Sequence, residues 1–198
     1  MPARVLFIGL DAAEPSLLRA LIERGDLPAL AALSSRGASG SLANCMLTLP
    51  GAVWPEIMSG VSCGTLPRFF HPRQVITGEA APRPLTAADV ADDPTFWKVA
   101  ADAGRRVAVA DIPHAPPTPG FSGVQLTEYG LHDSHFGSAS QPPSLLDQLR
   151  AVHGPYPTAS CDHAGGSTRA NLQLLADLHL AAQRKTNVLL DLLGREPW

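Results

Sequence analysis

Long apolar segments and strong charge are both missing from this sequence. No apolar run approaches the ~20 residues that a membrane-spanning helix needs, and VLFIGL at positions 5–10 has only the length of a strand. Asp11 and Glu14 interrupt that run and no A-x-A-like cleavage site follows, which disfavours a secretory signal. The net charge of -3 disfavours a mainly electrostatic nucleic-acid binder. We therefore expect neither a membrane nor a nucleic acid as a partner.

Paired cysteines and a dinucleotide fingerprint are also absent. No C-x-x-C pair occurs among Cys45, Cys63 and Cys161, which excludes a zinc ribbon or a thioredoxin-type site. An odd set of this kind is typical of reduced thiols and predicts a cytoplasmic protein. No G-x-G-x-x-G occurs either, so the sequence predicts no dinucleotide-binding residues.

The residues that are present predict a folded α/β protein. The chain has 198 residues, of which 45% are apolar, and a chain of this size buries roughly 70% of its unfolded surface. Two apolar runs, at 5–10 and 106–111, are predicted as parallel, nearly adjacent strands buried on both faces of one sheet. A further strand is predicted within 123–129. Strands that alternate with helices favour a parallel sheet with right-handed crossovers.

Proline and glycine mark the ends of most predicted helices. Helices are expected at 15–24, 28–36, 54–58, 94–103, from Ser144 onward, and at 167–193. The stretches 64–94 and 113–143 are predicted to be loop-rich excursions. The last helix carries an apolar stripe predicted to pack in the core: Leu172, Leu175, Leu178, Ala182, Leu189 and Leu193. Because such a helix usually leads into another strand, the chain is expected to be the N-terminal portion of a larger α/β protein.

Asp11 directly follows the first predicted strand. Ligands of open α/β sheets bind in the crevice outside the carboxyl ends of the strands, where a carboxylate can hold a divalent cation. The alternative is a turn or helix-capping residue ahead of Pro15. Asp111 ends the second predicted strand in the same manner, with a plain strand exit before Pro113 as the alternative.

Thr48 lies in the turn Leu47-Thr48-Leu49-Pro50-Gly51, ahead of the short predicted helix around Trp54. A hydroxyl at a helix N-terminus is close to the positive end of the dipole, which suits an alkoxide nucleophile and an anionic phosphoryl group. An ordinary capping or turn threonine is the alternative.

Three segments occur in an informative order. They are VLFIGLDAAEPSLLRALIERGDLPALAALSSRGASGSL, then LTLPGAVWPEIMSG, then TFWKVAADAGRRVAVADIPHAPP. In this order they resemble the opening, the nucleophile segment and a later stretch of the alkaline phosphatase superfamily, in its type I phosphodiesterase/nucleotide pyrophosphatase-like branch. The resemblance covers most of the chain and depends on the order of the motifs more than on any single one.

The resemblance implies a doubly wound, mainly parallel, alkaline phosphatase-like α/β fold, with 1–198 as the N-terminal part of a single such domain. It implies a phosphoric ester hydrolase that uses two zinc ions and a phosphorylated threonine or serine on a small-molecule phosphoester. Asp11 matches the first metal ligand of the family, and Thr48 is the hydroxyl nearest the nucleophile position, where it would also contact metal. If so, the two side chains should converge to roughly 4–6 Å, a metal-bridged distance.

Some features favour an alternative, a truncated or degenerate non-catalytic relative. Pro50 occupies the position four residues before Trp54 where many relatives carry the nucleophile, and Cys63 and Gly64 replace part of a common Pro-x-x-His-Gly. The remaining family ligands belong to a second half that this sequence does not contain. Residues 1–198 alone are therefore expected to turn over little aryl phosphate diester, because a catalytic zinc needs about three protein ligands.

Two histidine-containing groups are further candidates for metal binding. Asp162-His163 resembles an Asp-His ligand pair but precedes the last helix, the wrong place in the family order, so loop residues are the favoured interpretation. His132, Asp133 and His135 form a compact group that could reach a cleft edge, with exposed loop histidines as the favoured alternative.

Overall fold

The computed structural model describes residues 4–44, 50–66, 83–130, 134–157 and 166–195. The chain divides into two compact units, residues 1–44 and 45–198, and each is described by itself. The fold class is mixed α/β: the described residues form six α-helices, two short 3-10 helices and one three-stranded sheet. The assignment of the whole chain to one domain stays a prediction.

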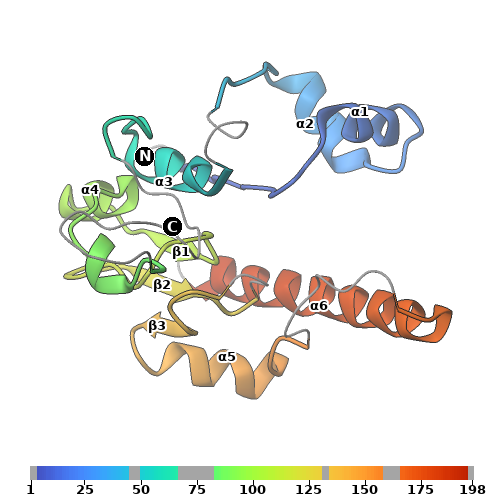
Figure 1. The fold of residues 1–198 in the computed structure, drawn as a ribbon. Coiled ribbons are helices and arrows are strands. Elements are labelled where there is room, and N and C mark those ends of the chain that lie inside the picture. The colour runs from blue at the N-terminus through green and yellow to red at the C-terminus, as the bar shows by residue number, and fades with distance from the viewer. Residues whose placement is uncertain (1–3, 45–49, 67–82, 131–133, 158–165, 196–198) are drawn as a thin grey trace. The chain divides into compact units, whose positions relative to one another are not determined.

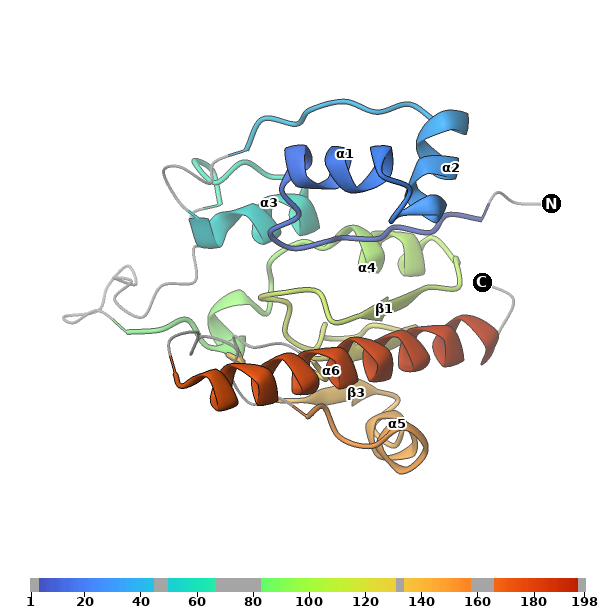
Figure 2. The ribbon, with the colours of Figure 1, turned by 90° about the vertical axis from the view of Figure 1, so that its right-hand side faces the viewer.

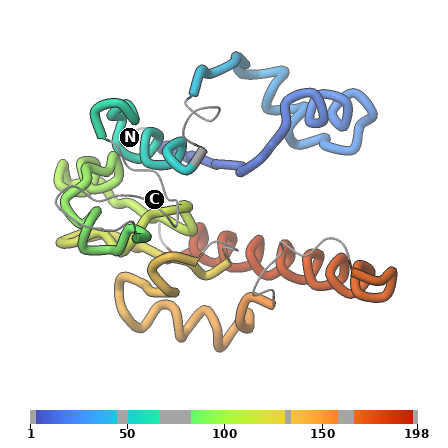
Figure 3. Tube along the Cα trace, in the orientation of Figure 1, coloured from blue at the N-terminus to red at the C-terminus, as the bar shows by residue number. Residues whose placement is uncertain are grey.

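The 1–44 unit contains an extended segment and two helices, α1 (Pro15–Glu23) and α2 (Pro28–Arg36). Proline begins both helices, as predicted, and the Glu14 carboxylate caps α1 by accepting a hydrogen bond from Leu17 N at 2.6 Å. No residue of either helix is buried. Figure 3 shows the extended run that leads into α1.

The strand predicted at 5–10 is not formed. Residues 4–10 are extended but belong to no sheet, and Val5 is 88% exposed and Ile8 66% exposed. The physical reason is that a strand needs a hydrogen-bonded neighbour, and the described part of this unit offers only two helices. The apolar run specifies an extended backbone but supplies no partner for it.

The sheet of the 45–198 unit has the order β1-β2-β3, with β1 at Ala108–Ala110, β2 at Val124–Thr127 and β3 at Ala139–Gln141. β1 and β2 confirm the strands predicted near 106–111 and 123–129, and they pair in parallel, Ala110 opposite Leu126. β3 was not predicted, and it pairs antiparallel to β2, so the sheet is mixed. Its sequence, Ala-Ser-Gln, lacks the β-branched and aromatic residues that signal a strand.

Helices cover both faces of this sheet, and alternate residues of β1 enter the two hydrophobic clusters that result (Figures 1 and 2). Val109 packs with residues of α3 (Val53–Ser59) and α4 (Phe96–Asp102). Ala110 packs against the cluster formed with α5 (Leu145–His153) and α6 (Thr168–Arg195). The 3-10 helix η1 (Pro50–Ala52) leads into α3, and η2 (Ala87–Val90) precedes α4.

α6 docks through a different face from the one predicted. Its buried residues are Ala181, Val188 and Leu192. The predicted stripe is exposed instead, with Leu172 62% and Leu175 52% accessible. Both faces are apolar, so periodicity alone did not distinguish the one that meets the sheet. Within the described residues, no helix combines the length and apolar character needed to cross a membrane.

Candidate functional site

A cluster of buried polar groups lies at the carboxyl ends of β1 and β2, beginning with Asp111. This side chain is 3% exposed and lies directly after β1. It accepts hydrogen bonds from Tyr129 N at 2.8 Å and Gly130 N at 3.1 Å, and Lys185 Nζ of α6 lies 3.1 Å from its Oδ2. Lys185 also donates to the Gly130 carbonyl at 3.2 Å. Asp111 therefore ties the ends of β1 and β2 to α6.

Glu128 follows β2 and is 4% exposed. Its carboxylate accepts hydrogen bonds from the Ser134 hydroxyl at 2.6 Å and from the backbone N–H of His135, Phe136 and Gly137 at 2.8, 2.9 and 2.6 Å. Burial by itself would raise the pKa of Glu128, but the four donors outweigh it and lower the pKa. Successive N–H groups of this kind form an anion-binding concavity, which Glu128 fills from within the chain.

The loop after β1 is held in an unusual conformation beside Glu128. Asp111, His114 and Glu128 have φ values of 51°, 59° and 49°, in the left-handed region that non-glycine residues seldom adopt. Gln125 of β2 supports the loop, because its side chain donates to the Pro116 carbonyl at 3.0 Å and accepts from Thr118 N at 2.9 Å. Strained backbone that neighbouring groups hold in place is common at functional sites.

The rings of His114 and His135 meet at this edge. Their centroids are 4.9 Å apart and their planes are inclined by 47°. His114 is half-buried and also lines a pocket, whereas the His135 side chain is exposed. The His135 backbone is fixed by Glu128, as described above. The structure thus pairs one histidine that was a sequence candidate with one that was not.

The pocket that His114 borders lies between the end of α3 and the loop at 114–119. Its lining is mostly apolar and includes Met58, Trp97 and several prolines, and the Trp97 indole N–H donates to the Thr118 hydroxyl at 2.9 Å. The cavity volume of ≈ 40 Å³ holds about three water molecules, well below the size of a substrate pocket. We therefore do not assign it to a substrate.

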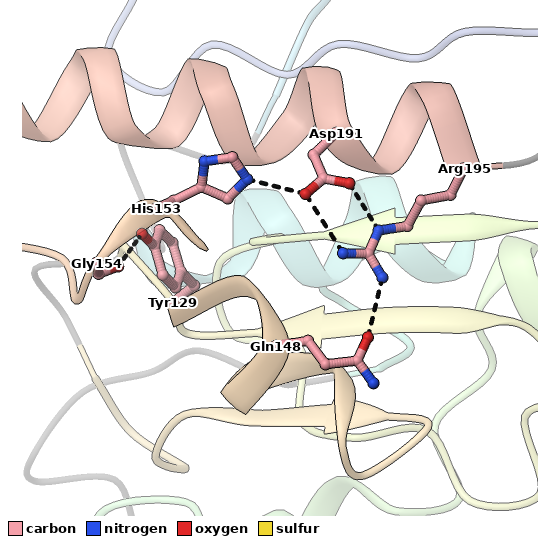
Figure 4. Close-up of polar contacts among 6 residues, drawn as sticks. All are labelled: Tyr129, Gln148, His153, Gly154, Asp191 and Arg195. Carbon is pink, nitrogen blue, oxygen red and sulfur yellow. Dashed lines mark hydrogen bonds and ion pairs between the residues drawn. The ribbon is translucent and has the colours of Figure 1, made fainter. Parts of the chain in front are cut away.

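A second polar network links α5 to α6 (Figure 4). His153 Nε2 lies 2.9 Å from Asp191 Oδ2, and Arg195 Nε donates to Asp191 Oδ1 at 2.7 Å. Arg195 also reaches Gln148 Oε1 at 3.3 Å. The hydrogen bonds from Arg195 and then from His153 lower the pKa of the Asp191 carboxyl. These contacts join two helix ends and are interpreted as a structural clamp.

Only one of the two predicted site residues, Asp11 and Thr48, lies among the described residues. Asp11 is an exposed residue in the turn before α1, within the 1–44 unit. Thr48 lies outside the described residues, so the expected convergence of the two side chains stays a prediction. His132, Asp133, Asp162 and His163 also lie outside them, and the metal hypothesis for these residues stays open.

The described residues do not fit a two-zinc centre. Among them, no three His, Cys, Asp or Glu side chains are grouped so as to hold a metal ion. The carboxylates of Asp111 and Glu128 are instead engaged by Lys185 and by backbone amides.

Sequence reasoning named Asp111 but missed Glu128 and Lys185. Glu128 lacked the signal of Asp111, because the residues ahead of it, Val-Gln-Leu-Thr, are not an apolar run and the predicted strand 123–129 included it. Lys185 could not be identified from the local sequence, because its partner Asp111 lies 74 positions earlier in the chain. Only the docking of α6 brings the two side chains together.

Comparison with known proteins gives no match: no family model, no curated protein and no solved structure is significantly similar to this chain.

Proposed function

We propose that the chain is part of a metal-dependent phosphoester hydrolase of the alkaline phosphatase superfamily, with a phosphodiesterase- or nucleotide pyrophosphatase-like activity. The observation that carries the proposal is the segment after Thr48, which runs directly into η1 and α3, the short helix that contains Trp54. The predicted nucleophile segment has this form, with a hydroxyl residue immediately ahead of a helix.

The architecture of the 45–198 unit supports the same assignment. It has a parallel β1–β2 pair, helices on both faces of the sheet, and acidic residues at the carboxyl ends of both strands. A doubly wound, mainly parallel alkaline phosphatase-like sheet is the finer fold that we propose, and β3 would be an antiparallel addition to it.

In the proposed reaction, the Thr48 hydroxyl oxygen attacks phosphorus and the bond from phosphorus to the leaving oxygen breaks. The alcohol departs with the hydroxyl proton, which leaves the remaining phosphate monoester group bonded to the Thr48 oxygen. Water then attacks this phosphorus, the bond to the Thr48 oxygen breaks, and a phosphomonoester is released. In the family reaction zinc would stabilise the developing charge, and the described residues do not supply a ligand set for it.

The second candidate is a non-catalytic relative that keeps the sheet. The specific observation in its favour is that Asp111 and Glu128, the carboxylates at the sheet edge, serve structural hydrogen bonds rather than an open site. Pro50 at the usual nucleophile spacing favours it as well.

An assay of aryl phosphate diester hydrolysis with zinc distinguishes the hydrolase from the non-catalytic relative. The assay compares residues 1–198 with any longer form read from the same gene. We expect little turnover by residues 1–198 and zinc-dependent turnover by a form that adds ligands. Asp11→Ala should lower the latter by about 100-fold or more. Thr48→Ala should abolish the covalent adduct of Thr48 with the phosphate monoester group, detected by mass spectrometry after an acid quench. Glu23→Ala, an exposed acid in the same unit, and Thr65→Ala are the matched controls. A longer form that binds zinc but is inactive would favour the non-catalytic relative.

A further inference from the structure

The apolar stripe that the sequence predicted for the core lies on the surface of α6. It consists of Leu172, Leu175, Leu178, Ala182, Leu189 and Leu193. Its leucines are between 37% and 62% exposed, and no residue of α6 before Ala181 is buried. At 1.5 Å per residue the stripe extends over about 32 Å of helix. Apolar surface that is exposed over such a length marks a site of association.

This leucine stripe carries no formal charge. At 3.6 residues per turn its members lie within an arc of about 120°, and the only polar residues in that arc between Leu172 and Leu193 are His179 and Thr186. The Asp, Lys and Arg side chains of α6 lie outside the arc: Arg169, Asp177, Arg184, Lys185, Asp191 and Arg195. A nucleic acid or an anionic membrane surface therefore finds no opposite charge on the stripe, whereas an uncharged apolar surface meets no repulsion.

The stripe is complementary to itself. Three of its leucines precede Ala182 and two follow it, so leucines occupy both ends and small or polar residues occupy the middle. If two copies of α6 lie antiparallel about a two-fold axis at Ala182, the leucines at each end meet the leucines of the other copy. The small alanines then let the helices approach closely at the centre. An isologous contact of this kind uses the same patch on both copies, and the opposed helix dipoles favour the antiparallel direction.

We propose that the leucine stripe is the contact between two copies of this chain, in a symmetric dimer with antiparallel α6 helices. A contact made by one helix of each copy is at the low end of specific interfaces, under about 1,200 Å² in total, so the dissociation constant is expected to be about 10–100 µM. Unfolding measurements at lower concentration report on the monomer. The proposal does not depend on the proposed hydrolase activity.

Sedimentation velocity of the tag-free 198-residue chain from about 5 to about 500 µM measures the association. We expect a monomer–dimer equilibrium that Leu175→Glu and Leu189→Glu each weaken by at least about tenfold, because they place a carboxylate in the apolar contact. Leu180→Glu is the matched control and should dimerise as the unmodified chain does, because Leu180 is 38% exposed but lies nearly opposite Ala182 around the helix. Circular dichroism verifies that each variant is folded.

Three results would overturn the dimer. One is a chain that stays monomeric at about 500 µM, and another is a control that dissociates as readily as the stripe variants. The third is a lower melting temperature of Leu175→Glu with unchanged association, which would show that another part of the same chain covers the stripe.

Crosslinking tests the antiparallel direction. In a chain with Cys45, Cys63 and Cys161 replaced by serine, a short bismaleimide should join two copies of Ala182→Cys, which lie beside each other at the two-fold axis. Thr168→Cys should not crosslink, because the two copies of residue 168 would be about 42 Å apart. Crosslinking of both variants, or of Thr168→Cys alone, would contradict the antiparallel dimer.

Discussion

The buried Glu128 carboxylate accepts hydrogen bonds from four donors. Its ionisation should therefore affect the free energy of unfolding. The donors from Ser134 to Gly137 lower its pKa in the folded chain despite burial. Its contribution is therefore fully present above the unfolded value of about 4.3 and is lost as pH falls through the lower folded value. We expect Glu128→Gln to lower the free energy of unfolding at pH 7 by about 1–3 kcal/mol, because the amide presents N–H groups to other donors.

Urea titrations at pH 7 and pH 3.5 measure this effect. The unmodified chain should lose more stability between the two pH values than Glu128→Gln does. Asp92→Asn, which alters an exposed carboxylate, is the matched control and should behave as the unmodified chain. An equal acid sensitivity of Glu128→Gln and the unmodified chain would contradict the assigned role.

The Asp111–Lys185 pair differs from a surface ion pair in the burial of its carboxylate. Asp111 is 3% exposed and also accepts hydrogen bonds from two backbone N–H groups. Asp111→Asn removes the negative charge that faces these two groups and Lys185. We expect a loss of about 2–3 kcal/mol in the free energy of unfolding. The Lys98–Asp102 pair on α4 is the comparison, and Asp102→Asn there should cost about 0.5 kcal/mol or less. Denaturant unfolding of the two variants compares them, and similar losses would show that Asp111 acts as an ordinary surface partner.

The docking of α6 can be tested with two leucines that are two positions apart. Leu192 is 3% exposed and packs in the cluster with α5 and β2, whereas Leu190 is 60% exposed. We expect Leu192→Ala to cost about 2–5 kcal/mol through lost burial and a cavity, and Leu190→Ala to change stability by about 0.5 kcal/mol or less. Thermal and urea unfolding provide the measurement. The opposite order would contradict the docking of α6 through Leu192.

The two units should differ in their capacity to fold alone. The buried hydrophobic residues of the described chain all lie between Ala52 and Leu192, and neither α1 nor α2 buries any residue. Helices of nine residues are marginal in water without packing. We expect residues 45–198 to unfold cooperatively in urea, and the peptide 1–44 to show weak helicity without a cooperative transition. Cooperative unfolding of the peptide, or its absence in 45–198, would contradict this division.

Local chemistry determined most helix positions from the sequence alone. Proline at the first position and glycine after the last predicted 15–24 and 28–36, and the structure has helices at Pro15–Glu23 and Pro28–Arg36. These signals act within one turn of backbone, so they need no distant partner. Asp111 could likewise be identified as a candidate from the sequence, because it directly follows an apolar run.

Tertiary structure alone decided which apolar surfaces find partners. The run at 5–10 has strand character but no paired neighbour in its unit, while the polar segment Ala139–Gln141 becomes β3 because β2 offers it an edge. α6 carries two apolar faces, and docking on the sheet buried the one with Val188 and Leu192. Glu128 and Lys185 acquire their roles from contacts across the fold, which local sequence patterns do not encode.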